Sequence, residues 1–208
     1  IGAMIAPNQE KVPNLQVFFS GLQALKSETG SPDEIDDYNR HMGISPTLLK
    51  TKSSGAILLE SNDPLSYPAI YSNYLSYPEE VDALIKGIRL AQKIVLTNAL
   101  REAGAAITPY IVKGCEDRIW DTDEFWACAV RHQTNPENHQ VGTCKIGAST
   151  DHFAVVDSSL RVYGTSNLRV IDASVLPDLP SGNLMAPTIM VGEKGADMIR
   201  TAWRHSLS

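Results

Sequence analysis

The sequence predicts an α+β fold, because segments with strand character and segments with helical spacing follow one another in separate groups. Residues 55–61 and 67–75 are rich in aliphatic and aromatic residues and flank a turn. From Pro78 the apolar residues recur at three- and four-residue steps, and residues 186–203 fit a closing helix. The chain therefore contains strands, a long helix, further strands and a final helix.

The first third of the chain is predicted to hold three strands. Residues 13–19, PNLQVFF, begin a strand after a proline, whereas residues 27–45 are expected to form a polar loop region. Residues 55–61 and 67–75 form a strand pair, because the intervening NDPLS consists of residues that tolerate turn geometry.

Two helices are expected in the middle of the chain. The first begins at Pro78, which two acidic residues follow, and has Gly104 near its end. Its apolar positions are Val81, Leu84, Ile85, Ile88, Ala91 and Val95. The second covers residues 121–133, where Asp121 and Glu124 have the spacing of a capping box.

The last third is predicted to return to strands before the closing helix. Residues 154–157, 161–164 and 168–176 have strand character and are interrupted by GTSN. In the helix at 186–203, Pro187 lies in the first turn, where its missing N–H costs nothing.

Composition and charge exclude several classes of protein. With 208 residues, 43% of them hydrophobic and 20% charged, the chain is an ordinary globular one. A net charge of -6 argues against nucleic acid or an anionic membrane as partner. No window approaches the roughly 18 apolar residues of a membrane span. The N-terminus lacks the features of a signal peptide, and because it is not methionine we expect a processed product or a piece of a longer protein.

The three cysteines are too few and too unevenly spaced for a disulfide scaffold or a zinc site. They are Cys115, Cys128 and Cys144. One bridge, between Cys115 and Cys128, is allowed but not predicted. The histidines His132, His139 and His152 match no zinc pattern with Cys144, so no metal site is expected.

Three polar residues are the candidates for chemistry: His139 in the segment HQVGTCKIG, Asp172 inside an apolar strand, and Asn183 before the last helix. Histidine is the side chain best suited to exchange protons near neutral pH. Each also has a structural interpretation: His139 as a loop histidine bonded to backbone, Asp172 as a turn former at a strand end, and Asn183 as a helix N-cap.

The N-terminus of the last helix, which follows PSGNLM, offers free N–H groups and the positive end of a dipole to an anionic group. Other catalytic patterns are absent from the sequence: there is no G-x-S-x-G, P-loop, H-E-x-x-H or G-x-G-x-x-G after a strand.

The sequence resembles the C-terminal half of the glucose–methanol–choline (GMC) flavoprotein oxidoreductases. Five segments carry this resemblance in the family's order and spacing: HQVGTCKIG, AVVDSSLRVYG, NLRVIDASVLP, SGNLMAPTIM and GEKGADMI. KSSGAILLESNDPLSYPAI and YPEEVDALIKGIRLAQKI resemble the family's substrate-domain strand pair and helix, which extends the resemblance from Pro13 to Trp203. DEFWACAVRHQT and GEKGADMI are most similar to the glucose dehydrogenase branch.

The resemblance implies an FAD-dependent enzyme that oxidises the CH–OH group of an alcohol or sugar, with a quinone or oxygen as electron acceptor. His139 would take the hydroxyl proton while hydride passes to the flavin, and Asn183 would hydrogen-bond the substrate oxygen. The residues expected to contact the cofactor are Asp172, Ala173, Leu184 and Met185.

The resemblance also implies a division of the chain. Residues 1–135 would form an antiparallel-sheet substrate-binding domain with helices, and residues 136–208 the catalytic loop and a segment that returns to the FAD domain. The dinucleotide-binding half is expected to be absent from this chain, which would leave the chain alone incomplete and make that half its partner. The resemblance leaves the cellular location open, with secretion as one expectation.

The sequence departs from the family at Asn138, where an aromatic residue is common, at Ile146, where methionine is usual, and at Lys52, where arginine is frequent. Two alternatives remain open: a non-catalytic truncated paralogue or fragment that serves as a binding or interaction module, and a lyase that uses the same site without net oxidation.

Overall fold

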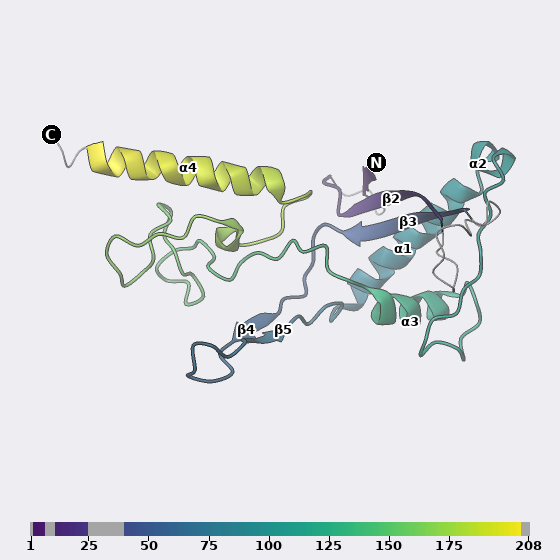
Figure 1. Ribbon diagram of the computed structural model, residues 1–208, viewed down its shortest axis with the longest axis horizontal. Coiled ribbons are helices and arrows are strands. Elements are labelled where there is room, and N and C mark those ends of the chain that lie inside the picture. Colours follow the sequence, from purple (N-terminus) through teal and green to yellow (C-terminus); the bar gives the residue numbers. More distant parts are fainter. Residues whose placement is uncertain (1, 7–10, 25–39, 205–208) are drawn as a thin grey trace. The chain divides into compact units, whose positions relative to one another are not determined.

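The computed structural model describes residues 2–6, 11–24 and 40–204. It combines helices with antiparallel sheets, as the sequence predicts (Figure 1). Contacts divide the chain into two compact units. The first comprises Ile1–Leu49 and Leu75–Asn135, and the second Lys50–Tyr74 and Pro136–Ser208. Among the described helices, none has the length and hydropathy needed to cross a bilayer.

The sheet of the first unit has three antiparallel strands in the order β1-β2-β3. They are β1 (Gly2–Ile5), β2 (Leu15–Ala24) and β3 (Arg40–Leu48). The strand predicted at residues 13–19 lies largely within β2 and is confirmed. The pairing of β2 with β3 is interrupted by an irregularity between Ser20 and Leu22.

The prediction of a polar loop at residues 27–45 is wrong for residues 40–45, which belong to β3, while residues 27–39 lie outside the described part of the chain. The strand is hard to recognise in the sequence because it contains Pro46. This proline pairs with Val17 on an edge strand, where a residue without an N–H is tolerated. Helix α1 packs there: Gly87 has no side chain, and an added Cβ would lie 2.5 Å from Cβ of Pro46.

The long helix predicted from Pro78 to the region of Gly104 is two helices, α1 (Pro78–Val95) and α2 (Asn98–Glu102). The break lies at Thr97, whose backbone is extended with ψ 151°. Its hydroxyl donates to the carbonyl of Ile94 at 2.8 Å, so the side chain competes with helix continuation. Gly104 ends α2 in the left-handed region, at φ 84°.

Helix α3 (Asp123–Gln133) confirms the second predicted helix, but its N-cap is Thr122 and not Asp121. The Thr122 hydroxyl oxygen accepts from the N–H of Phe125 at 3.1 Å. The predicted capping box therefore does not form, because Asp121 lies outside the helix with φ 64°.

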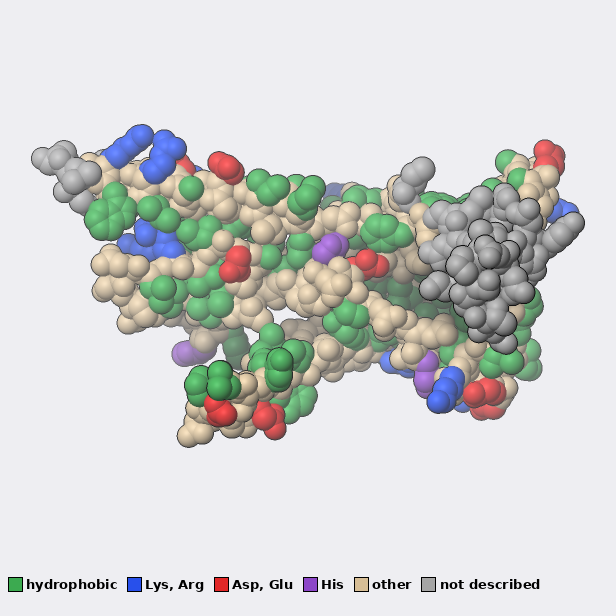
Figure 2. Space-filling view, in the orientation of Figure 1, with side chains coloured by type: hydrophobic (Ala, Val, Ile, Leu, Met, Phe, Trp, Pro, Cys, Tyr) green, Lys and Arg blue, Asp and Glu red, His purple; other side chains and the backbone are tan. Residues whose placement is uncertain are grey.

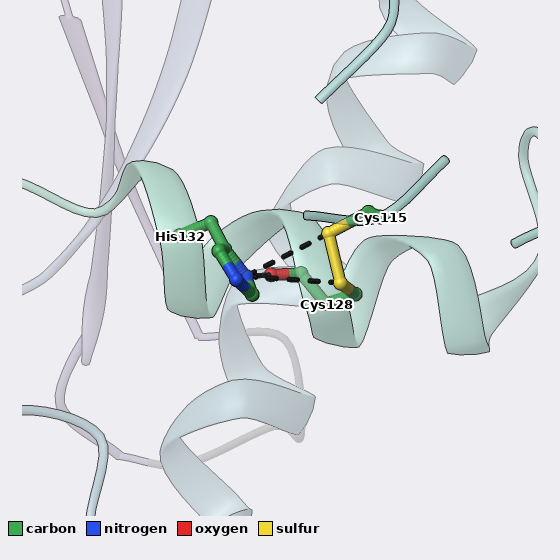
Figure 3. A group of neighbouring side chains, drawn as sticks. All are labelled: Cys115, Cys128 and His132. Atoms are coloured by element: carbon green, nitrogen blue, oxygen red, sulfur yellow. Dashed lines mark hydrogen bonds between the residues drawn. A yellow bond between two sulfur atoms is a disulfide. The ribbon is translucent and has the colours of Figure 1, made fainter. Parts of the chain in front are cut away.

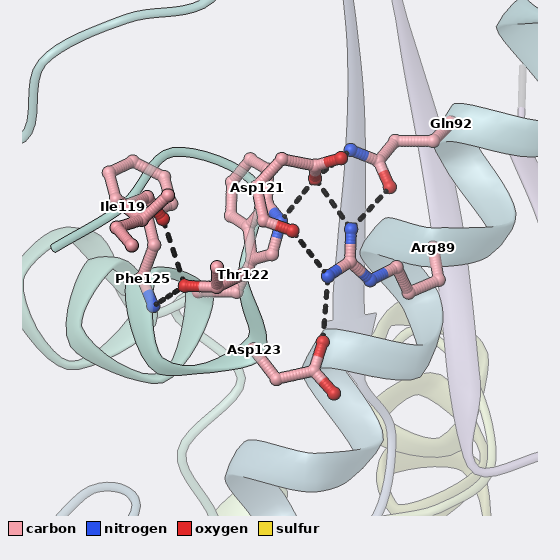
Figure 4. A network of polar contacts seen from close by, with 8 residues as sticks. Arg89, Gln92, Ile119, Asp121, Thr122, Asp123 and Phe125 are labelled. Atoms are coloured by element: carbon pink, nitrogen blue, oxygen red, sulfur yellow. Dashed lines mark hydrogen bonds and ion pairs between the residues drawn. The ribbon is translucent and has the colours of Figure 1, made fainter.

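Asp121 instead joins α1 to the start of α3 (Figure 4). Its Oδ1 accepts from Arg89 at 2.5 Å, from Gln92 at 2.6 Å and from the indole of Trp126 at 2.8 Å. Arg89 also donates to Asp123 at 2.7 Å. Partial burial raises the pKa of Asp121, but these hydrogen bonds outweigh it and leave the pKa below its usual value.

The core of the first unit lies between its sheet and helices α1 and α3. Leu15 of β2 is fully buried and packs with Leu84 of α1 and Val130 of α3. Phe125 and Trp126 of this core contact each other and the adjacent Trp120 edge to face, with ring centroids 5.0–5.3 Å apart. A disulfide joins Cys115 to Cys128, the pairing that the sequence allows.

The second unit begins with a hairpin of β4 (Ala56–Leu58) and β5 (Ala69–Tyr71). Both predicted strands are confirmed, although each is shorter than its pattern. Figure 2 shows hydrophobic side chains gathered on the surface of this hairpin. Those at least half exposed are Ile57, Leu58, Leu59, Leu65, Tyr67, Ile70 and Tyr71.

The strands predicted at 154–157, 161–164 and 168–176 do not form. Single bridges, such as Val156 with Val162, take their place, and the last segment contains the 3-10 helix η1 (Ala173–Val175). Tight turns explain the difference, because they leave too little straight chain between them for strands. One of these turns follows Asp157 and is closed by hydrogen bonds from backbone N–H groups to the Asp157 carboxylate.

Helix α4 (Met185–Arg204) confirms the predicted closing helix. It packs on the preceding segment through Val191, which lies in a small core with Val156, Leu160 and Val175. At Gly195 an added Cβ would lie 2.5 Å from Cγ2 of Ile171, so the helix can approach only because this position has no side chain.

Replacing Asp121 with asparagine should lower the free energy of unfolding at pH 7 by about 1 kcal/mol, after allowance for solvent screening of a side chain that is 43% exposed. Because the folded pKa of Asp121 is lowered, its contribution is present above the unfolded value of about 3.9 and is lost as pH falls through the folded value. Thermal unfolding measured between pH 2 and 7 should show that the stability of the variant falls less steeply toward acidic pH than that of the parent. Asp117→Asn, at an exposed site outside this network, is the control.

Alanine should have opposite effects at two glycines of α4. Gly195→Ala should destabilise the fold by about 1–2 kcal/mol, because overpacking against Ile171 exceeds the gain in helix propensity. Gly192→Ala meets no atom within 4 Å and should stabilise it by about 1 kcal/mol. Denaturant unfolding of both variants tests the packing of α4, and equal effects would contradict it.

Candidate active site

His139 lies in an irregular segment of the second unit and is half-buried. Asn138, just before it, has φ 57°, a left-handed conformation that asparagine tolerates better than most residues. The chain therefore bends immediately before the imidazole. In the described part of the chain, the side chain of His139 makes no hydrogen bond to the backbone, so the structural interpretation of this residue is not supported.

Two backbone hydrogen bonds attach the segment after His139 to the one that contains η1. The N–H of Cys144 donates to the carbonyl of Ser174 at 3.0 Å, and the N–H of Ile146 donates to that of Val175 at 2.9 Å. Gly142, in the segment after His139, has a left-handed backbone conformation with φ 89°. These bonds bring the segment of His139 next to Asp172 and Ala173, although about thirty residues separate them in the sequence.

Asp172 is not inside a strand, as the sequence suggests, but is the N-cap of η1. Its Oδ1 accepts from the N–H of Ser174 at 2.8 Å and from the Ser174 hydroxyl at 2.5 Å. Its other oxygen receives no hydrogen bond from the described residues, and the side chain is exposed. Capping therefore fixes the carboxylate while one oxygen stays available to a ligand.

Asn183 is not the N-cap of α4. The helix begins at Met185, and the carbonyl of Leu184 accepts the first helical hydrogen bond, from Thr188 at 2.9 Å, so Leu184 is the capping position. Asn183 is exposed and stands one residue earlier, and no hydrogen bond within the described residues uses its amide. Leu184 is buried, whereas Met185 is 76% exposed.

The start of α4 offers a defined electrostatic environment. Met185 and Ala186 have N–H groups without helical partners, and Pro187 has none to offer. The first turn contains no acidic residue, so nothing opposes the positive end of the helix dipole there. The exposed side chains of Met185, Ile189 and Met190 add apolar surface to this end.

One small core positions three of these segments. Val175 follows Asp172 and Ala173 in the chain, Val191 lies on α4 after Met185, and both are buried together, with Ile146 packed against them. The structure thus joins the segment of His139, η1 and α4 through shared packing. No hydrogen bond within the described residues links His139 to Asn183 directly.

Two ion pairs that the sequence analysis missed hold the surrounding loops. Lys145 contacts Asp151 at 2.7 Å, and this hydrogen bond is the main reason that the pKa of Asp151 lies below its usual value. Arg161 contacts Asp157 at 2.8 Å. The i,i+4 spacing of Asp157 and Arg161 was the only signal in the sequence, and it has meaning only once the turn between them is known.

Ile146, a departure from the resemblance, has a packing role: it forms a parallel bridge with Val156 and packs against the small core. A half-buried imidazole, an exposed amide, a fixed carboxylate and a helix N-terminus therefore belong to one compact unit. This arrangement can exchange a proton, orient a polar substrate and hold an anionic group.

Comparisons with known proteins agree with this arrangement. Residues 51–192 match the GMC oxidoreductase family. The chain is 42% identical over 197 residues to glucose dehydrogenase [FAD, quinone] of Drosophila pseudoobscura pseudoobscura, covering 94% of the chain and 32% of that protein. It is 43% identical to the protein of the same name in Drosophila melanogaster, with 92% and 31% covered.

Solved structures are similar as well. Formate oxidase of Aspergillus oryzae RIB40 matches with a TM-score of 0.74 at 25% identity, over 93% of this chain and 32% of that one. A fungal aryl-alcohol oxidase matches with a TM-score of 0.69 at 28% identity, over 92% and 28%. The chain spans about a third of the length of these curated relatives. In sequence and in fold, it belongs to the GMC oxidoreductase family and corresponds to its C-terminal domain.

Proposed function

We propose that this chain is the C-terminal part of an FAD-dependent oxidoreductase that oxidises the CH–OH group of an alcohol or sugar. One observation carries this proposal: in a chain of this family, backbone pairing attaches the segment of His139 to that of Asp172, which packs against α4. The relatives point the same way, since two are named glucose dehydrogenase [FAD, quinone] and others oxygen-dependent choline dehydrogenase.

In this proposal His139 takes the proton of the substrate hydroxyl. A half-buried imidazole suits this work, because histidine is the side chain best suited to exchange protons near neutral pH and partial burial limits competition from water. Asn183 orients the substrate by hydrogen-bonding its oxygen. An amide is a poor base, so the proton transfer rests on His139.

The residues at the candidate site fit FAD. Asp172 has a carboxylate oxygen available for a polar part of the cofactor. The start of α4, with Leu184 and Met185, combines unpaired N–H groups with apolar surface, which suits a ring system that gains negative charge on reduction. Bound FAD would supply hydride acceptance, which no side chain of this chain can provide.

Residues outside this chain would complete the enzyme. The family's dinucleotide-binding half would hold most of the cofactor's phosphates. Within this chain, residues 1–135 would shape the substrate pocket. Quinone and oxygen are both electron acceptors named for relatives, and we propose one of these two classes here.

The disulfide between Cys115 and Cys128 supports the further proposal that the protein is secreted.

Replacing His139 with alanine should lower kcat for alcohol or sugar oxidation by about 10²–10⁴-fold, because general-base catalysis contributes on that scale. The assay uses the complete protein with FAD and an artificial electron acceptor, and flavin absorbance should show that FAD stays bound. The control is His152→Ala, at an exposed position in the same unit, which should retain activity. Turnover within a few-fold of the parent in His139→Ala would refute the assigned base.

A substitution at Asp172, with a matched control at Asp178, separates a cofactor contact from a structural cap. Asp172→Asn keeps an oxygen for the N–H of Ser174 but removes the charge, so FAD affinity should fall about tenfold or more while thermal stability without FAD stays unchanged. Asp178→Asn, at a nearby exposed position, should alter neither. Flavin fluorescence titration measures the affinity, and unchanged affinity in Asp172→Asn would leave only the capping role.

A further inference from the structure

Cys115, Cys128 and His132 form a cluster in the first unit that the proposed oxidation chemistry does not use (Figure 3). Nδ1 of His132 lies 3.6 Å from Sγ of Cys115 and 3.7 Å from Sγ of Cys128. In the structure the two sulfurs are joined as a disulfide. The imidazole therefore stands beside both sulfurs of one bond.

The local fold fixes all three residues. Cys128 and His132 are four residues apart on α3 and share one face of the helix. Cys115 is anchored by a turn in which its N–H donates to the carbonyl of Val112 at 2.9 Å, and its side chain is 1% exposed. Gly114 lies against the ring, since an added Cβ would come within 2.7 Å of Nε2 of His132.

We propose that reduction of this disulfide creates a binding site for one divalent cation of the zinc class, with Cys115, Cys128 and His132 as ligands. Two thiolates and one imidazole are a donor set that zinc prefers, and three protein ligands leave a fourth position for water. The i,i+4 pair on a helix and a third ligand from a nearby loop place the donor atoms within 4.8 Å of one another. The proposal does not depend on the enzymatic function.

Reduction of the disulfide is a balanced reaction when the reductant is a dithiol. One dithiol sulfur attacks Cys128, the less buried of the pair, and the second closes the reductant's own disulfide, leaving Cys115 and Cys128 as thiols. Two electrons and two protons thus pass to the protein. When the cation binds, the thiols release two protons as the metal–sulfur bonds form.

His132 must also change its tautomer. Its Nδ1 lies 3.0 Å from the carbonyl oxygen of Cys128, and only a protonated nitrogen can donate there. Binding transfers the proton to Nε2 and leaves the Nδ1 lone pair free to face the sulfurs. A surface hollow lined by Gly114, His132 and Gln133, among others, gives the cation a path from solvent.

The test adds cobalt(II), a spectroscopic substitute for zinc, to the full chain before and after reduction with a phosphine. The reduced protein should bind one cobalt per chain and show thiolate-to-cobalt charge-transfer absorption, whereas the disulfide form should show none. His132→Gln should weaken binding about tenfold or more. Two controls should match the parent: His152→Gln, at an exposed histidine, and Cys144→Ser, at the free cysteine.

Circular dichroism of each reduced protein shows whether the fold persists, and the exposed position of His132 makes the glutamine variant a mild change. The proposal is overturned if the reduced parent shows no charge-transfer band or loses its fold, or if the disulfide form binds equally well. Unchanged affinity in His132→Gln, or loss of the band in Cys144→Ser, would also overturn it.

Discussion

The candidate site depends on the pairing of two irregular segments by two backbone hydrogen bonds, from Cys144 to Ser174 and from Ile146 to Val175. Neither segment is a strand or a long helix, so neither has a regular hydrogen-bond ladder of its own. Buried backbone groups need partners, and here each segment supplies them to the other. Without this pairing the segment of His139 would have no fixed position relative to η1.

Packing makes the pairing specific. Val156, Val175 and Val191 come from three parts of the second unit and bury one another, and Ile146 adds its side chain beside them. Close approach of α4 requires Gly195, because a side chain there would meet Ile171. The same small core therefore supports the helix N-terminus and the carboxylate of Asp172, so that mutations far from any ligand can disturb the candidate site.

The first unit is held together by different means. Asp121 accepts hydrogen bonds from three side chains of α1 and α3, and a disulfide joins the loop before α3 to that helix. In an irregular loop such as 103–121, these polar and covalent links replace the ladder that a strand would provide. They also explain how Cys115 reaches a position beside Cys128 and His132, where the proposed cation site can form.

Much of the fold was predictable where one physical signal dominates. Helical spacing predicted α1, sequence signals for a helix start predicted α3 and α4, and β-forming residues around a turn predicted β4 and β5. Local propensity failed where tertiary contacts decide: Pro46 lies in an edge strand, Thr97 breaks a helix, and turns replace the strands expected after residue 153.

The sequence by itself determined the family, through motifs whose order and spacing are specific, and it identified His139, Asp172 and Asn183 as candidates. Only the tertiary structure decided that Asp172 caps η1, that Leu184 and not Asn183 is the capping position of α4, and that Cys115 and Cys128 meet His132. The physical reason is that caps, disulfides and shared cores depend on which residues meet in space, and spacing along the chain carries little information about that.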